Sequence, residues 1–234
     1  MNSSQNVGIY RHEDKYYINR HEAFLLKSYL EKSMHPDKNA GANGEYWIRS
    51  LYFDTLDNKD FFDKINGFSE RGKLRLRIYN MNNKTVKLEL KNKRGNYILK
   101  ESLELDKEHA SLLISGISEP LLSYGSQLAN KVFLYMHLER LRPILLIDYE
   151  REAYTFPFQN IRITIDKNVR ASINPRHFYQ KEIMMVPVFN DTQYVLEVKY
   201  HTILPGFIRS ILSNVCPLKT SVSKYCLARK AISI

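Results

Sequence analysis

Two arginines separated by one residue, Arg75 and Arg77, lie in a stretch of strictly alternating side chains, KLRLRIY, at residues 73–79. Guanidinium groups form paired hydrogen bonds with phosphate oxygens, so two of them on one side of a strand could bind a chain of phosphates. Because side chains of a β-strand alternate between its two faces, the stretch predicts a strand with one apolar and one cationic face. If the cationic face points to an interior, an anion must lie against it.

Other segments with a strand pattern also carry charged or polar side chains on one parity. These are Arg11, Glu13 and Lys15, then Lys87, Glu89 and Lys91, then Arg151, then Arg162, Thr164 and Asp166, and finally Glu197 and Lys199. A solvated sheet face usually mixes both charge signs with Ser, Thr and Gln, whereas these faces favour Arg and Lys. Closing such strands into an antiparallel barrel would line a cationic channel. Carboxylates among the cations would serve to hold a divalent metal beside phosphate oxygens.

The composition of the chain bounds the class of partner. A formal net charge of +10 over 234 residues favours an anionic partner: nucleic acid, nucleotide, polyphosphate or a membrane surface. No secretory signal is visible, and the longest aliphatic run, residues 144–147, is too short to span a bilayer. Two cysteines, Cys216 and Cys226, are too few for a disulfide framework. We therefore expect a cytoplasmic protein with no membrane segment.

Local signals predict the elements that position the charged residues. Asn19 and Glu22 form a capping-box pattern that predicts a helix beginning at Arg20. Strand patterns cover residues 7–18, 46–55, 73–79, 85–93, 97–105, 142–154, 160–172 and 193–201. Helical patterns cover residues 20–33, 56–68, 106–140, 205–214 and 220–232. Strands on both sides of a helical insertion favour one α+β domain over residues 1–234.

An ordered series of short motifs resembles the VTC domain, the polyphosphate polymerase branch of the triphosphate tunnel metalloenzyme superfamily. The motifs are YRHEDKY, RSLYFDT, KLRLRIY, KLELK, DYEREAY, RITIDKNVRAS, VLEVKY and SKY. The resemblance implies an antiparallel eight-stranded β-barrel with flanking helices, whose tunnel binds a nucleoside triphosphate and a divalent metal and extends a polyphosphate chain. We expect a stand-alone domain, without the phosphate-sensing or membrane domains of larger relatives.

The resemblance also implies roles for individual residues. It matches phosphate-binding cations to Lys15, Arg75, Arg77, Lys91, Arg151, Arg162 and Lys224. It matches the metal-binding glutamate to Glu197. We add Lys199 as a further cation that neutralises the chain, and Glu13 or Glu89 as a second carboxylate for Mn²⁺ or Mg²⁺.

The chain departs from the wider superfamily in one motif. The hydrolase and cyclase branches open on a Glu-x-Glu-x-Lys strand, in which two carboxylates bind metal, whereas this chain has Arg11, Glu13 and Lys15 at those positions. Exchanging a carboxylate for a cation lowers the capacity to bind metal and strengthens the binding of anions. The departure favours the polymerase branch over the triphosphatase branch.

The resemblance implies a metal-dependent phosphotransferase that moves the terminal phosphoryl group of ATP, or of another nucleoside triphosphate, onto a growing polyphosphate chain. The partners we expect are the nucleotide and polyphosphate or pyrophosphate. The attacking phosphate oxygen is already ionised, so no general base is required. One alternative is a triphosphatase of the same fold. The other is a non-catalytic binder of RNA or polyphosphate, with its cations on an outer face; nucleic acid is not the partner we expect.

The same hypothesis makes a prediction about stability. If Arg75 and Arg77 lie among other cations, the fold rather than partner carboxylates holds them in place. Like charges a few ångströms apart repel each other. Replacing either arginine with Ala should then leave the ligand-free protein equally stable or slightly more stable.

Overall fold

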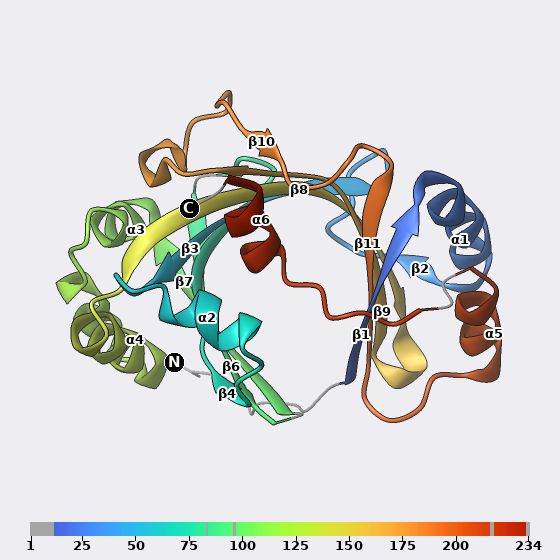
Figure 1. Ribbon diagram of the computed structural model, residues 1–234, viewed down its shortest axis with the longest axis horizontal. Helices are drawn as coiled ribbons and strands as arrows, with labels where there is room; N and C mark the ends of the chain where they lie inside the picture. Colours follow the sequence, from blue (N-terminus) through green and yellow to red (C-terminus); the bar gives the residue numbers. More distant parts are fainter. Residues whose placement is uncertain (1–11, 83, 96, 216–217, 233–234) are drawn as a thin grey trace. The chain divides into compact units, whose positions relative to one another are not determined.

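The computed structural model describes residues 12–82, 84–95, 97–215 and 218–232 (Figure 1). The described chain divides into two compact units. Unit 1 comprises residues 49–147 and 172–184, and unit 2 comprises residues 12–48, 148–171 and 185–232. Arg11, Cys216 and the first part of the predicted strand 7–18 lie outside the described residues.

Unit 2 contains part of the antiparallel sheet. Its strands are β1 (His12–Asn19), β2 (His35–Pro36), the second half of β8 (Arg142–Phe156), β9 (Ile161–Ser172), β10 (Val186–Pro187) and β11 (Gln193–Tyr200). The hydrogen-bonded order is β1-β11-β9-β8, with β10 on β9 and β2 on β8. The register places Lys15 opposite Glu197, and Glu197 opposite Thr164. The alternating pattern thus brings charged residues far apart in sequence onto one face.

Helices cover the apolar face of this part of the sheet. They are α1 (Arg20–Ser33) and α5 (Gly206–Val215), which contact each other (Figure 1). The capping box that predicts the start of α1 is present: Glu22 N donates to Asn19 Oδ1 at 2.9 Å, and Asn19 N donates to Glu22 Oε2 at 2.7 Å. The buried core includes Leu26, Leu30, Ile163, Ile165, Leu196, Val198 and Ile208. The C-terminal helix α6 (Lys224–Ile232) contacts β10.

Unit 1 contains the other strands. They are β3 (Glu45–Asp54) from Arg49 onward, β4 (Glu70–Arg71), β5 (Leu74–Tyr79), β6 (Thr85–Arg94), β7 (Tyr97–Asp106) and the first part of β8, up to Ile147. The hydrogen-bonded order is β3-β5-β6-β4, with β7 on β6. The apolar parity of β5, formed by Leu74, Leu76 and Ile78, is no more than 1% exposed. The alternation that predicts this strand is confirmed.

In the described part of unit 1, one α-helix follows β3 in the chain and two follow β7. They are α2 (Lys59–Ile65), α3 (Lys107–Ile114) and α4 (Gln127–Leu138), together with a short 3-10 helix at Glu119–Tyr124. The predicted helical stretch 106–140 is therefore divided. The division occurs where Gly116 and Gly125 adopt φ angles of 88° and 59°, which end a helix at little steric cost. Both α3 and α4 contact β7.

The predicted class, α+β with an antiparallel sheet and flanking helices, is confirmed. The described sheet has eleven strands, of which β2, β4 and β10 are two residues long; the eight longer strands match the predicted number. Over the described residues the hydrogen-bonded order has two ends, at β1 and β4. The C-terminal segment makes a hydrogen bond to the outer edge of β1, in which Thr220 N donates to Lys15 O at 2.8 Å. The assignment of one domain to residues 1–234 stays a prediction.

None of the helices among the described residues is long and apolar enough to cross a membrane.

Candidate functional site

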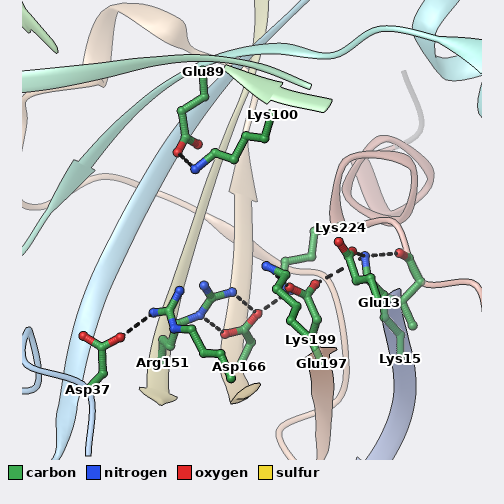
Figure 2. A network of polar contacts seen from close by, with 12 residues as sticks. Glu13, Lys15, Asp37, Glu89, Lys100, Arg151, Asp166, Glu197, Lys199 and Lys224 are labelled. Carbon is green, nitrogen blue, oxygen red and sulfur yellow. Dashed lines mark hydrogen bonds and ion pairs between the residues drawn. The ribbon is translucent and has the colours of Figure 1, made fainter. Parts of the chain in front are cut away.

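In unit 2, one buried carboxylate holds two of the predicted phosphate-binding cations. Arg151 Nε lies 2.6 Å from Asp166 Oδ1, and Arg151 Nη2 lies 2.8 Å from Asp166 Oδ2 (Figure 2). Lys224 Nζ, from the first turn of α6, lies 2.5 Å from the same Oδ2 atom. Asp166 is fully buried, so these contacts are screened very little by solvent. The carboxylate fixes an arginine of β8 and a lysine of α6 at one point.

The electrostatics of this cluster follow from its geometry. Burial alone would raise the pKa of Asp166, but Arg151 and Lys224 outweigh it and lower that pKa to about 2. Burial opposes the charged form of Arg151, but Asp166 raises the pKa of the guanidinium well above its usual value. Asp166 and Arg151 are therefore both ionised at neutral pH, and the Lys224 side chain pairs with the same carboxylate. Their summed charge is positive, as an anion-binding site requires.

A second cluster in unit 2 surrounds Lys15. Its ammonium lies 2.8 Å from Glu13 Oε1 and 3.4 Å from Glu197 Oε2, and Lys199 Nζ lies 2.5 Å from Glu197 Oε1 (Figure 2). Burial disfavours the charged form of Lys15, but Glu197 and Glu13 raise its pKa above the usual value. Burial likewise disfavours the Glu197 carboxylate, yet Lys199 and Lys15 lower its pKa well below the usual value. The two glutamates thus converge on one ammonium group.

Two buried polar atoms beside this cluster have no hydrogen-bond partner among the described residues: Thr164 Oγ1 and Arg162 Nε. Thr164 is opposite Glu197 across β9 and β11, and Arg162 is opposite Lys199. Buried polar atoms are normally hydrogen-bonded, so atoms without a partner on a face of charged residues indicate where a polar ligand could bind.

Another nitrogen of the Arg162 guanidinium, Nη2, is already held by protein groups. Its Nη2 atom lies 2.8 Å from Asp37 Oδ2 and 2.7 Å from the Tyr46 hydroxyl. Asp37 is in turn fixed by Asn39, whose backbone N donates to Oδ1 at 2.9 Å. Sequence reasoning missed Asp37 and Tyr46, because they lie on a loop and on β3 and belong to no charged strand pattern.

The segment before α6 runs along β1 and brings Lys224 to the site. Lys15 Nζ donates to Val222 O at 3.2 Å, in addition to the backbone hydrogen bond from Thr220 to Lys15. Lys219 Nζ lies 2.8 Å from Asp14 Oδ2. These contacts tie the C-terminal segment to the strand that carries Glu13 and Lys15.

In unit 1, a single buried carboxylate, Glu89, contacts three cations. Its Oε2 atom lies 2.7 Å from Arg75 Nε and 3.5 Å from Arg77 Nη1. Figure 2 shows the third contact, from Lys100 Nζ to the Oε1 atom. Glu89 is 1% exposed. The prediction that no partner carboxylate holds Arg75 and Arg77 is therefore wrong. The reason is the register of β5 and β6, which places Arg75 directly opposite Glu89.

Hydroxyl groups also contact the two arginines. Arg75 Nη1 donates to the Tyr52 hydroxyl at 2.9 Å, and Arg77 Nε donates to Ser50 Oγ at 3.0 Å. Burial would raise the pKa of Tyr52, but Arg75 and Arg77 lower it to about 8. Partial burial, together with Arg75, lowers the pKa of Lys100 to about 8 although Glu89 opposes that shift. The cluster therefore keeps an excess of positive charge around one carboxylate.

The sequence-predicted residues thus fall into two groups, one in each unit. Arg75, Arg77, Glu89 and Lys91 lie in unit 1, where Lys91 is opposite Lys100 across β6 and β7. The others, in unit 2, are Glu13, Lys15, Arg151, Arg162, Glu197, Lys199 and Lys224. Sequence reasoning missed Lys100, although the alternation in YILKESLEL places Lys100, Ser102 and Glu104 on one face. That the two groups line one tunnel stays a prediction.

The donor atoms bear on the predicted metal. In the part of the chain that the structure describes, no group of three or more His, Cys, Asp or Glu side chains could hold a metal ion. Glu13 and Glu197, however, both lie within ion-pair distance of Lys15 Nζ, so their carboxylates point to one place. Two such carboxylates fit Mg²⁺ or Mn²⁺ of the kind that takes its remaining ligands from substrate phosphates and water.

Comparisons with known proteins show the family and the fold of the chain. The family model of the VTC domain matches residues 10–233. A candidate adenylyl cyclase from Hippeastrum, described as having a dominant triphosphatase activity, has a similar structure with a TM-score of 0.60 and 17% identity, and the match covers 95% of this chain and 96% of that protein. A candidate adenylate cyclase from Bacillus halodurans has a TM-score of 0.58 and 15% identity, with 90% and 92% covered. At these identities the structural likeness shows the fold alone. No curated protein matches the chain.

Proposed function

Because the chain belongs to the VTC domain family, we propose that it is a polyphosphate polymerase, which transfers the terminal phosphoryl group of ATP to a growing polyphosphate chain. The observation that carries the proposal is the Asp166 cluster, in which a fully buried carboxylate holds Arg151 and Lys224 in fixed positions. Cations that are fixed before the substrate binds stabilise transferred phosphate without a cost of reorganisation.

In phosphoryl transfer, the protein contributes mainly by positioning the reactants and by stabilising their charge. An oxygen of the terminal phosphate of the chain forms a bond to the γ-phosphorus of ATP, the bond from that phosphorus to its bridging oxygen breaks, and ADP leaves with the electron pair. No proton must move, which suits a site in which Arg151 and Asp166 are both ionised at neutral pH.

We assign each predicted residue to binding. Arg151 and Arg162 clamp phosphate oxygens in unit 2, with Arg162 Nε as the donor that has no partner among the described atoms. Lys15 and Lys199 supply point charges on the same face. In unit 1, Arg75, Arg77 and Lys91 bind phosphates beside Lys100. These roles match the fork geometry of arginine and the mobile charge of lysine.

Glu13 and Glu197 would hold the divalent metal, whose bound positive charge would offset the charge of the transferred phosphate. Lys15 and Lys199 neutralise these carboxylates in the ligand-free protein. When phosphates attract the two ammonium groups, the glutamates become available as oxygen ligands.

A triphosphatase is the second candidate. The Hippeastrum protein of similar fold is described with a dominant triphosphatase activity, and the same cations would bind a triphosphate whose terminal group is transferred to water. The clusters themselves favour transfer to phosphate, because Lys15 and Lys199 lie against the carboxylates and add positive charge to them. We propose ATP as the donor and therefore a cytoplasmic site of action.

Incubation of the purified protein with ATP and Mn²⁺ tests the proposal. Acid-labile long-chain phosphate, visible on a gel, and stoichiometric ADP are expected. An Arg151→Ala variant should lose this product, whereas Lys131→Ala, which alters a surface pair with Glu101, should keep it. Orthophosphate and ADP without any polymer would establish the triphosphatase instead. Binding of polyphosphate without turnover of ATP would establish a non-catalytic binder.

A further inference from the structure

One face of the β5-β6-β7 sheet in unit 1 carries more positive charge than the predicted triphosphate site uses. The register aligns its residues in four transverse rows, which we call the cationic ladder. From one end to the other, the rows are Arg77, Lys87 and Glu104; Arg75, Glu89 and Ser102; Lys73, Lys91 and Lys100; and Arg71, Lys93 and Ile98. Lys73 belongs to the third row because its backbone N and O both bond to Lys91.

Contacts between side chains agree with this alignment. Arg75 and Lys100, from two different rows, both contact Glu89. Lys73, with Arg75 and Arg77, contributes to the lowered pKa of Tyr52, so its charge lies near theirs. The opposite face is apolar, since Leu88 and Leu90 are no more than 1% exposed.

The third row brings three like charges together, one of which, Lys100, also contacts Glu89. Three lysines, Lys73, Lys91 and Lys100, stand directly opposite one another on adjacent strands, and like charges in that relationship destabilise a sheet. The whole ladder has eight cationic side chains and two carboxylates, Glu89 and Glu104. A bound polyanion would reverse the cost, because its phosphates would stand between the charges.

The ladder is also long. From the row of Lys87 to the row of Lys93 is six residues along β6, or about 20 Å at the rise of an antiparallel strand. Arg71, Lys73 and Lys93 lie at the end away from Arg77, and all three side chains are half-buried. Arg71 and Lys93 extend the site by one row beyond that of Lys91, the last predicted triphosphate ligand on this face, and Lys73 stands opposite Lys91 at the boundary.

We propose that Arg71, Lys73 and Lys93 form an outer subsite that binds phosphates of a polyphosphate chain beyond the three nearest Arg75 and Arg77. The inference rests on the proposed function and adds a determinant of chain length to it. The outer subsite makes long chains bind more tightly than short ones, and it leaves the affinity for triphosphate unchanged.

The make-up of the face favours an inorganic chain over RNA. Proteins that bind single-stranded nucleic acid combine cations with aromatic rings on which bases stack. The ladder rows contain no aromatic residue, and Tyr79, the next residue on the same parity of β5, has the Lys87 ammonium 5.8 Å from its ring centroid. The face can neutralise phosphates and offers no described platform for bases.

The test compares two ligands in two variants of the full-length protein. Binding of tripolyphosphate and of polyphosphate of about a hundred units is measured by calorimetry for the wild type, Lys93→Gln and Arg71→Gln. Each variant should bind the long chain about tenfold more weakly, the effect of losing one charge-assisted contact at a partly exposed site, and should bind tripolyphosphate as the wild type does. Arg94→Gln is the matched control, because Arg94 is the next residue on β6 and has the opposite parity.

The salt dependence provides a second readout. The slope of log affinity against log salt for the long chain should fall by about one unit in each variant, because one fewer counterion is displaced. Equal losses for both ligands would place Lys93 and Arg71 in the triphosphate site and overturn the outer subsite. No loss for either ligand would overturn it as well.

Other outcomes separate this proposal from the proposed function. If the wild type binds tripolyphosphate but gains nothing from chain length, the outer subsite fails and the polymerase stands. If the wild type binds neither ligand, the polymerase fails and the outer subsite fails with it. If single-stranded RNA binds as tightly as long polyphosphate and loses as much in Lys93→Gln, the surface is a general polyanion site and the commitment to polyphosphate is overturned.

Discussion

Arg75 Nε lies 2.7 Å from Glu89 Oε2, the residue directly opposite it on the neighbouring strand. The Glu89 carboxylate is buried, and its Oε2 atom lies closer to Arg75 than to Arg77. This pair reverses what the cationic pattern alone predicts about stability, because a buried carboxylate that loses a partner costs free energy.

Replacing Arg75 with Ala should therefore destabilise the ligand-free protein, by about 1–3 kcal/mol in the free energy of unfolding. The same variant should show a smaller rise in melting temperature with tripolyphosphate, because ligand stabilisation follows affinity. Thermal melts with and without the ligand measure both. Adding Glu89→Gln to the variant should not restore the lost stability, because Arg77 and Lys100 would then lose the carboxylate that they still share. A variant as stable as the wild type would show that the pair contributes nothing.

Asp166→Asn should weaken the protein at neutral pH by about 3–5 kcal/mol, because Arg151 is buried and loses its counter-charge. The pKa of Asp166 is about 2, below the usual 3.8, so its contribution is complete above pH 4 and is lost as the pH falls towards 2. Urea denaturation at pH 3 and pH 7 measures the difference. The wild type should lose more stability than the variant on acidification, and equal losses would contradict the assignment.

Asp60 predicts the opposite trend with pH. It is 1% exposed on α2, contacts the Tyr135 hydroxyl at 3.3 Å, and has a pKa raised to about 7 by burial and by Asp54. Because the folded pKa lies above the usual 3.8, the protein loses roughly 3–4 kcal/mol of stability as the pH rises from 4 to 7. Asp60→Asn should remove this loss and melt at a higher temperature than the wild type at pH 8.

The control for this prediction is Asp63→Asn on the same helix. Asp63 lies 3.7 Å from Lys59 and is more exposed than Asp60, so its replacement should leave the dependence of the melting temperature on pH as it is in the wild type. If the melting temperatures of the wild type and of Asp60→Asn changed with pH in the same way, Asp60 would not be a buried, protonated carboxyl group.

Glu197→Gln tests the metal prediction. The amide keeps the shape but cannot offer a charged oxygen, so turnover with ATP should fall at least about a hundredfold and binding of Mn²⁺ with a non-hydrolysable ATP analogue should weaken. Glu31→Gln, an exposed change on α1, should alter neither measurement. Electron paramagnetic resonance of bound Mn²⁺ gives a readout independent of activity. Unchanged Mn²⁺ binding in Glu197→Gln would remove this residue from the metal site.

Local features of the fold could be predicted from the sequence because neighbouring residues determine them. Asn19 and Glu22 specify the start of α1 through hydrogen bonds over three positions. The alternation around Arg75 specifies a strand and its buried face for the same reason.

The partners of the predicted cations could not be predicted in the same way. Glu89 meets Arg75 through the register in which β5 and β6 pair, and Asp37 meets Arg162 from a loop far away in sequence. Such contacts depend on how strands pair and where loops run, and no periodicity records them. The resemblance identified the cations, whereas the carboxylates that contact them could be identified only from the structure.

The hydrogen bond from Lys15 Nζ to Val222 O joins positions 207 residues apart. During synthesis, the cluster around Lys15 therefore cannot form until nearly the whole chain has left the ribosome. The cationic ladder, in contrast, lies within residues 71–104, and its strands can pair much earlier. The nascent chain thus presents an exposed cationic sheet to cellular polyanions before the other half of the predicted machinery exists.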